Sequence, residues 1–544
     1  MKGWLLKFGG PVLVLFYLVL QLAALPQAAL TDDDDFYIPA GISYAEWLGK
    51  VVRFDGAFQR ESIDRAFEPN HEHPPLAKYV FGLCHFAFRG WLGPTDSARV
   101  GTVLFSTLLA AAMIWLARRH LGAERGLYAG GLAVLLLLLL PRFFFHSHAA
   151  TLDVPVATMY FLAAAAVLEA ERRPRAGWVA GVLFGLASAT KLNGPFLLLP
   201  YGLFLMLTRW GLGRGEPRDP RTFNLPRIPT TLVTMATVGP LVFLGLWPWL
   251  WFDLFQRVGA YVGFHLHHYG ILFLYFGTVY SKDPHAPWHA PFTMAATTTP
   301  LAITALALVG LGFGAAVVAR RLRHREGPDD DQRKEGDLIL SSALHAAFAI
   351  LIVAFSGGAK YGGEKLFAPF FPFWCLLAGY GALRLYEAVV TPRARALVAG
   401  VVTLGVASAL ALQLHFGPYA LSAYNGLVSG LRGATALGFE RQYYDLAFRD
   451  LVGWLSANAP PNTKVHFLPN NWEYVRTYNW YKKAGELRPD IQVVNSEREA
   501  NFLVITHERR FARYGADLQR YRGRKVILEK RVDGVPIWTL LDLR

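Results

Sequence analysis

Four adjacent aspartates, Asp32 to Asp35, follow an apolar N-terminal segment and precede Phe36 and Tyr37. Neighbouring carboxylates repel one another, so stability gives no reason to place them where a membrane helix should emerge into water. Catalysis does give a reason, because an enzyme acting on a lipid-borne substrate needs a carboxylate at the bilayer edge. The alternative interpretation is a solvated acidic linker, since most charge runs are solvated.

Two more segments combine residue types that suit substrate binding. Residues 70–78 read NHEHPPLAK, and the two prolines fix a turn and extend the chain before them. Residues 142–148 hold one arginine and two histidines, and Asp153 follows shortly after them. Isolated charges near predicted helix ends are Arg99, Lys191, Lys360 and Lys365. Ionisable residues at a membrane edge are costly and usually functional.

The composition indicates the helices that must position these residues. The chain has 544 residues, of which 53% are hydrophobic and 17% charged, and its mean hydropathy is positive. A soluble domain carries about 25% charged residues. Apolar stretches recur at short intervals and approach the roughly 20 residues that a membrane helix needs. The sequence therefore predicts a mainly α, polytopic membrane helix bundle.

We expect about 11 spans, at residues 5–25, 97–117, 125–145, 150–168, 176–191, 195–209, 230–250, 293–319, 338–356, 366–388 and 396–414. The net charge of +14 comes largely from short basic loops, which argues against nucleic-acid binding. Those loops are Lys2/Lys7, Arg118-Arg119, Arg172 to Arg175, Arg209 to Arg227, Arg320 to Arg325 and Arg393/Arg395. The positive-inside rule puts all of them, and the N-terminus, in the cytoplasm. A cleaved signal peptide is the alternative for the first span.

This topology predicts a transmembrane catalytic domain over residues 1–414, with external segments at 26–96 and 251–292. Residues 76–93 are apolar, but counting them as a span would put Arg118-Arg119 outside, so we expect an interfacial or re-entrant helix there. Residues 415–544 alternate strand-like pieces, at 464–468, 491–494, 501–505 and 525–528, with helical stretches such as 443–457. They predict a small extracytoplasmic α/β domain.

In these motifs the chain resembles a known family. Asp33-Asp34-x-x-Tyr37 is similar to the Asp-Glu-x-x-Tyr motif of glycosyltransferase family 39, which includes protein O-mannosyltransferases and lipid A aminoarabinose transferases within the C-type (GT-C) superfamily. His73 to Lys78 resembles the mannosyltransferases' His-Pro-Pro-Leu-(Gly/Ala)-Lys, and Arg99 occupies a family arginine position. Segments 287–291 and 418–439 resemble bacterial members more weakly. Asp34 departs from the family's glutamate, which leaves open which aspartate is the counterpart of the first acid.

The resemblance implies a sugar donor on polyprenyl phosphate, whose phosphate leaves as a stable anion without a general acid. One carboxylate then suffices as base for the acceptor hydroxyl, unlike the paired carboxyls of glycosidases. We expect Asp33 or Asp34 to be that base, in a single inverting displacement. The residues expected to bind the donor and its phosphate are Arg99, Lys191, Lys365, His73, Glu72, Lys78, Tyr37, His146, His148 and Asp153.

Several alternatives remain at this point. Histidines at 265, 267, 268, 285 and 289 could join the aspartates in binding a divalent ion, but their spacing fits no standard zinc pattern, so we expect no metal cofactor. A transporter or flippase of lipid-linked sugar is the competing function; it should show inverted repeats, and none is visible. The expected partners are the donor, a hydroxyl acceptor of unknown type and the lipid bilayer, in a bacterial inner membrane.

Overall fold

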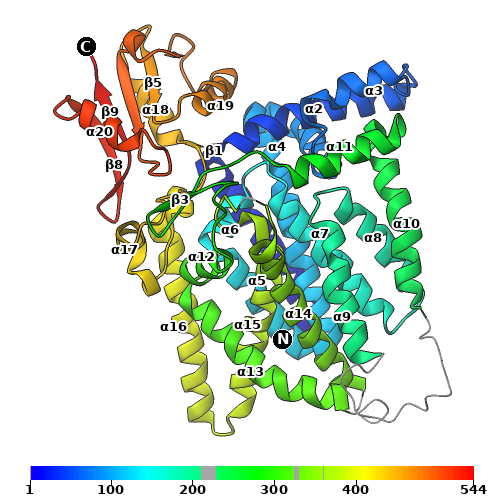
Figure 1. Cartoon of the computed structure of the whole chain (residues 1–544). Coiled ribbons are helices and arrows are strands. Elements are labelled where there is room, and N and C mark those ends of the chain that lie inside the picture. The colour runs from blue at the N-terminus through cyan, green and yellow to red at the C-terminus, as the bar shows by residue number, and fades with distance from the viewer. Residues whose placement is uncertain (1, 210–227, 324–329, 359) are drawn as a thin grey trace.

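The computed structural model describes residues 2–209, 228–323, 330–358 and 360–544, so most of the basic segment 209–227, together with Arg325, lies outside the described residues. The described chain forms a tall helical bundle with a small mixed domain at one end (Figure 1). Helices α2 (Asp32–Arg53) and α11 (Leu254–Leu266) lie at that same end. The predicted class, a helix bundle with a C-terminal α/β part, is confirmed.

Each of the predicted spans has a helix in the described chain. They are α1 (Lys2–Ala24), α4 (Leu76–Leu121), α5 (Ala123–Leu138), α7 (Asp153–Ala170), α8 (Ala176–Ser188), α9 (Leu198–Thr208), α10 (Thr230–Leu246), α13 (Leu301–Arg323), α14 (Asp330–Phe355), α15 (Phe370–Ala388) and α16 (Pro392–Phe416). Six helices among the described residues are long and apolar enough to cross a membrane, and three more are apolar but shorter. The protein is therefore a multi-pass membrane protein.

Some predicted boundaries were wrong. The span expected at 293–319 is two helices, α12 (Ala290–Thr298) and α13, because Pro300 lies between them. The span expected at 338–356 starts earlier in the structure, since α14 already begins at Asp330. Residues 76–93 are helical, as predicted, but they continue into the next helix, and the two arms of α4 meet at Gly93 with φ of 73°. A left-handed φ followed by Pro94 explains the break.

Helix α2 (Asp32–Arg53) packs against the first arm of α4 through glycines. A Cβ atom on Gly82 would lie 1.9 Å from the carbonyl oxygen of Gly41, so only glycine allows this approach. The other elements of this end are α3 (Arg60–Phe67), α6 (Pro141–His146), α11 (Leu254–Leu266) and the hairpin β2 (Phe273–Tyr275) with β3 (Thr278–Tyr280). The close packing fixes the start of α2 over the bundle.

The C-terminal domain is built on a five-stranded mixed sheet in the order β6-β5-β7-β9-β8. Its strands are β5 (Lys464–Leu468), β6 (Gln492–Val493), β7 (Phe502–Thr506), β8 (Val526–Val532) and β9 (Val535–Asp542). Strands β6, β5 and β7 run parallel, and β9 pairs antiparallel with both β7 and β8. The four predicted strands are present. The sequence analysis missed β9, which is buried almost continuously and so shows no alternation.

The helices of this domain are α17 (Gly430–Ala436), α18 (Arg449–Asn458), α19 (Trp472–Lys483) and α20 (Tyr514–Arg520). The helix predicted from residue 443 begins only at Arg449, because Leu446–Ala447 form a short strand, β4. Its partner is β1 (Leu30–Thr31), which directly precedes the aspartates. This antiparallel pair joins the C-terminal domain to the exit of the first helix.

Candidate functional site

The four aspartates form the first turn of α2 rather than a loop. Thr31 caps the helix in a capping box: its hydroxyl accepts from the Asp34 amide, and the Asp34 carboxylate accepts from the Thr31 amide. The positive end of the helix dipole favours carboxylates in the first turn. The statement that stability gives no reason for these aspartates was therefore wrong, since one of them caps the helix.

Asp34 is buried, and its contacts indicate a structural role. Its side chain is 1% exposed, it accepts from the amide of Ala150 at 2.7 Å, and it lies 3.3 Å from the Nε atom of Arg99. Arg99 is itself fully buried and donates to the carbonyls of Ala28 and Ala29. Asp34 and Arg99, predicted as base and phosphate ligand, thus meet each other inside the protein.

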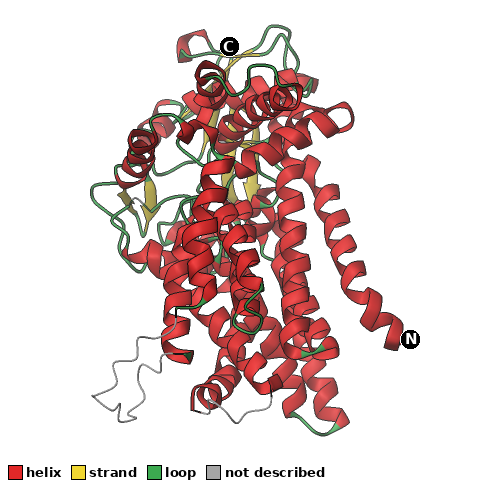
Figure 2. Ribbon diagram, turned by 90° about the vertical axis from the view of Figure 1, so that its right-hand side faces the viewer, coloured by secondary structure: helices red, strands yellow, loops and turns green. Residues whose placement is uncertain are grey.

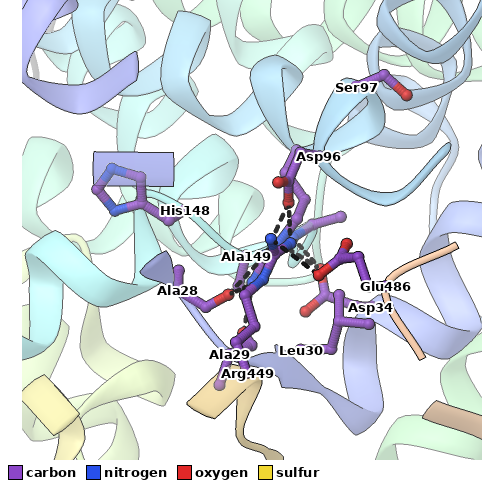
Figure 3. Close-up of polar contacts among 12 residues, drawn as sticks. Ala28, Ala29, Leu30, Asp34, Asp96, Ser97, His148, Ala149, Arg449 and Glu486 are labelled. Atoms are coloured by element: carbon purple, nitrogen blue, oxygen red, sulfur yellow. Dashed lines mark hydrogen bonds and ion pairs between the residues drawn. The ribbon is translucent and has the colours of Figure 1, made fainter. Parts of the chain in front are cut away.

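A second arginine completes this buried ionic cluster (Figure 3). Arg449 of the C-terminal domain donates to the carbonyl of Ala28 and forms ion pairs with Asp96 and Glu486. Asp96 also lies 3.3 Å from Arg99, so the two guanidinium groups share one carboxylate. Removing one partner of such a buried pair is strongly destabilising. The cluster locks the exit of α1, the start of α2, α4 and the C-terminal domain together.

Asp33 has a different environment. Its Oδ2 atom accepts from Lys365 Nζ at 3.2 Å and from the Tyr444 hydroxyl at 2.5 Å, and Lys365 also donates to Tyr444 at 2.6 Å. The Asp33 side chain keeps 19% of its surface exposed. Burial alone would lower the pKa of Lys365, but the charges of Asp33 and Asp153 outweigh it and raise that pKa. Lys365 is therefore a cation beside an accessible carboxylate.

The outer two aspartates face the C-terminal domain. Asp35 pairs with Arg476 at 2.6 Å and accepts from the indole of Trp480 at 2.9 Å, both on α19. Burial and the charges of Asp33 and Asp445 raise the pKa of Asp32 well above its usual value. The raised pKa of Asp32 favours its protonated form beside the pair of Asp33 and Lys365.

A second lysine–aspartate pair lies close to the first. Lys191 Nζ donates to Asp153 Oδ1 at 2.6 Å, and the Asp153 side chain is 2% exposed. His146 is buried, its ring is 5.7 Å from the ring of Tyr444, and neither of its nitrogens has a hydrogen-bond partner in the described chain. Lys365 and Asp153 interact electrostatically with His146, so the structure brings Asp33, Lys365, Lys191, Asp153 and His146 together.

The HPPLAK lysine holds its own loop instead of facing outward. Lys78 is fully buried and donates to the carbonyls of Asn70 and His73, at 2.5 and 2.7 Å, and to the Tyr44 hydroxyl at 3.1 Å. This positions the His73 ring 5.9 Å from that of Tyr37 and 5.2 Å from that of His265. Burial and His265 hold the pKa of His73 well below its usual value, so this imidazole is neutral.

Of the remaining predicted residues, Tyr37 lies near Asp33, whereas His148 and Glu72 interact with other parts of the protein. Tyr37 is buried, and burial together with the charge of Asp33 raises its pKa, which places its hydroxyl near the Asp33 site. The nitrogens of His148 face the carbonyls of Phe144 and Gln21, at 2.6 and 2.8 Å, which is a structural arrangement. Glu72 is half-buried and acts on Lys78 through its charge.

Sequence reasoning missed Tyr444 and the role of Glu364. Glu364 pairs with Arg142 at 3.1 Å, and both side chains are at most 3% exposed. Arg142 also donates to the carbonyl of Ala423 and lies over the Tyr424 ring. Glu364 precedes Lys365 in a glycine-rich stretch that drew attention only for its lysines. In the described parts of the chain, no group of three or more His, Cys, Asp or Glu residues is arranged to hold a metal ion.

The chain is similar to one protein family in part of its sequence and to solved structures in its fold. Residues 72–214 match the family described as dolichyl-phosphate-mannose-protein mannosyltransferase. The crystal structure of apo ArnT from Cupriavidus metallidurans aligns over 99% of this chain and 98% of its own, with 15% identity and a TM-score of 0.51. The same protein bound to undecaprenyl phosphate aligns over equal shares, with 14% identity and a TM-score of 0.49.

The archaeal oligosaccharyltransferase AglB from Archaeoglobus fulgidus, in complex with an inhibitory peptide and a dolichol-phosphate, covers 94% of this chain and 71% of its own, at 14% identity and a TM-score of 0.46. No curated protein matches the sequence significantly. The alignment with apo ArnT over nearly the whole of both chains shows a common fold, and the family match covers the HPPLAK loop and the helices that follow it. The chain therefore shares the fold of ArnT, and residues 72–214 are similar to the dolichyl-phosphate-mannose-protein mannosyltransferase family.

Proposed function

We propose that this protein is an inverting glycosyltransferase that moves a sugar from a polyprenyl-phosphate donor to a hydroxyl acceptor at the outer face of a bacterial inner membrane. The observation that carries the proposal is the contact of Asp33, an accessible carboxylate at the start of α2, with the cation Lys365 and with Tyr444. The description of the matching family names dolichyl-phosphate mannose, a polyprenyl-phosphate sugar, which supports this class of donor.

In this proposal Asp33 is the base and Asp34 is not. A base must reach the acceptor hydroxyl, and Asp34 is enclosed by the Thr31 cap, the Ala150 amide and Arg99. Asp33 retains exposed surface, is paired with Lys365, and lies near the Lys191–Asp153 pair. The geometry also favours a positioning role for Arg99, Lys78 and His148, since each is buried among backbone carbonyls.

The donor phosphate belongs beside Lys365 and Lys191 in this reading. Two ammonium groups stabilise the charge that grows on the leaving phosphate, and His146 offers a further hydrogen bond from its unpartnered ring. An apolar cavity of about 280 Å³ between α12, α13, α14 and α15 is lined by residues that include Phe370 and Trp374. One of its lining residues, Phe370, is only five residues after Lys365 in the sequence. The cavity is suited to part of a prenyl tail.

The chemistry then follows from the contacts. Lys365 leaves Asp33 for the incoming phosphate, which frees a carboxylate oxygen for the acceptor. The acceptor oxygen gives its proton to Asp33 and attacks the anomeric carbon, while the bond from that carbon to the phosphate oxygen breaks and its electrons stay on the phosphate. One displacement inverts the anomeric configuration, and no proton donor is needed for the leaving group.

Purified protein incubated with labelled polyprenyl-phosphate sugars tests this function. The expected result is transfer to a hydroxyl acceptor with inversion at the anomeric carbon, which NMR of the product reports. Transfer with retained configuration would contradict the single displacement. If the wild type transfers nothing from such donors, yet moves lipid-linked sugar across vesicle membranes, the protein is a transporter and the proposal is wrong.

A further inference from the structure

A large groove separates the first helix from the second arm of α4, at the end of the bundle remote from the aspartates. It encloses about 740 Å³, within the range of about 300–1,000 Å³ that is typical of ligand pockets. Its walls are Pro11, Val14 and Leu15 of α1 and Ile114, Trp115 and Arg118 of α4. Leu15 is 60% exposed and Trp115 48%, so the groove opens outward, along the side of the bundle that contacts lipid.

The groove is apolar along its length and basic at one end. Arg118 and Arg119 line it there; Arg118 Nη2 donates to the carbonyl of Leu6, and Arg119 is paired with Glu169. Lys7, one residue after Leu6, is exposed at the same end of α1. Among the described residues, Arg118 is thus a cation beside hydrocarbon walls without an ion-pair partner, whereas the charge of Arg119 is matched by Glu169.

A second groove on the other side of α1 provides an internal contrast. It encloses about 440 Å³ between α1 and α5 and is lined by apolar and aromatic residues and glycine, including Phe16, Leu127 and Leu135. In a bilayer both grooves must fill with hydrocarbon, because water has no partners there. Of the two grooves, only the α1–α4 groove has a cation at its end. Only this groove can therefore distinguish lipids by the charge of their headgroups.

We propose that the α1–α4 groove binds an anionic glycerophospholipid, with an acyl chain along Val14, Leu15 and Trp115 and the phosphate at Arg118. Charge complementarity identifies the occupant, since a basic residue at a membrane surface favours anionic lipids. Figure 2 shows the N-terminal end of α1 at the edge of the bundle, where a lipid can enter sideways. The site is independent of sugar transfer: Leu6 and Ala24 are roughly 27 Å apart along α1, at 1.5 Å per residue, and Asp33 lies beyond Ala24.

Trp115 allows a direct test, because bromine atoms on a lipid chain quench indole fluorescence at contact. Detergent-solubilised protein is titrated with brominated phosphatidylglycerol and with brominated phosphatidylcholine, and the signal of Trp115→Phe is subtracted. We expect phosphatidylglycerol to bind about fivefold more tightly, the preference that one arginine confers at a membrane surface. Equal affinity of the wild type for both lipids overturns the proposal.

Three variants make the assignment specific. Arg118→Gln should remove the preference for phosphatidylglycerol, Arg118→Lys should keep it, and Arg393→Gln, at an exposed arginine in the first turn of α16, should leave it unchanged. Size-exclusion profiles confirm that each variant is folded. A preference that survives in Arg118→Gln, or one that Arg393→Gln also removes, contradicts a site at Arg118. Displacement of the brominated lipid by undecaprenyl phosphate at lower concentrations than by phosphatidylglycerol would identify a different occupant and overturn the proposal.

Discussion

The Asp33 carboxylate and the Lys365 ammonium lie 3.2 Å apart, although 332 residues separate them in the chain. The two neighbours of Asp33 on α2, Asp32 and Asp34, form no hydrogen bond with a lysine in the described chain. One position in the acidic run therefore differs from its neighbours by having a lysine partner from a distant part of the sequence. The chemical roles of the four aspartates follow from this difference.

Substitution of the two central aspartates should separate catalysis from stability. Asp33→Asn removes the proposed base and should lower the transfer rate by about 10²–10⁴-fold while the protein stays folded. Asp34→Asn removes one of the two carboxylates beside the buried Arg99 and weakens the Thr31 cap, so it should cost about 3–5 kcal/mol of stability. Transfer assays and thermal unfolding in detergent measure both effects. Full activity of Asp33→Asn would refute its assignment as the base.

Removing the charge of Lys365 should slow the chemical step. Lys365→Gln takes away a cation proposed to stabilise the leaving phosphate, and loss of one such group typically costs about 10²–10³-fold in kcat. Arg395→Gln, at an exposed basic residue in the first turn of α16, is the control and should leave kcat unchanged. Single-turnover measurements with a saturating polyprenyl-phosphate sugar give the rate. A change in KM alone, with kcat intact, would mean that Lys365 only helps to bind the donor.

The Asp35–Arg476 contact should help to hold the C-terminal domain on α2. The two side chains are only partly exposed and lie 2.6 Å apart, so a double-mutant cycle of Asp35→Asn and Arg476→Gln should give a coupling energy of about 0.5–3 kcal/mol. Hydrogen exchange in α19 should rise in both single variants. A coupling energy of zero would mean that β1, β4 and the arginine cluster hold the domain alone.

The docking of the C-terminal domain should weaken as pH rises. Burial and the charge of Asp445 raise the pKa of Glu473 from 4.5 to about 7, so between these values the folded protein binds more protons than the unfolded chain. Stability therefore falls as pH increases through this window. Unfolding temperatures at pH 5 and pH 8 measure the slope, and Glu473→Gln should reduce it. An unchanged slope in that variant would exclude Glu473 as its source.

The helix bundle was predictable because lipid allows so few structures. Apolar runs of the right length must be helices, and the strand-like pieces after residue 460 alternate clearly enough to be placed. Helix breaks were harder: the split before Leu301 depends on one proline, and the merging of residues 76–93 with the next helix depends on how Gly93 bends. Such breaks change where a helix begins without changing its hydropathy.

The candidate site was predictable in its residue types but not in its pairings. Sequence reasoning found Asp33, Lys365, Lys191, Asp153 and His146, because each is an ionisable group in apolar surroundings. It could not tell that Lys78 holds the carbonyls of its own loop or that Arg99 is enclosed with Asp34, because an inward-facing and an outward-facing charge look alike in sequence. Tyr444 was missed since one tyrosine among 23 carries no signal until its contact is known.

The short strand pair of β1 and β4 has a consequence for biosynthesis. Thr31 pairs with Leu446, and Asp33 accepts a hydrogen bond from Tyr444, which is 411 residues later in the chain. The first turn of α2 therefore gains these partners only after more than 400 further residues have been synthesised. At about 5–20 residues per second, synthesis of that stretch takes roughly 20–80 s. During this interval Arg99 has no Arg449 beside it and Asp33 no Tyr444. A nascent chain therefore holds an incomplete acidic cluster, which is completed only when the C-terminal domain has been synthesised and has docked on α2.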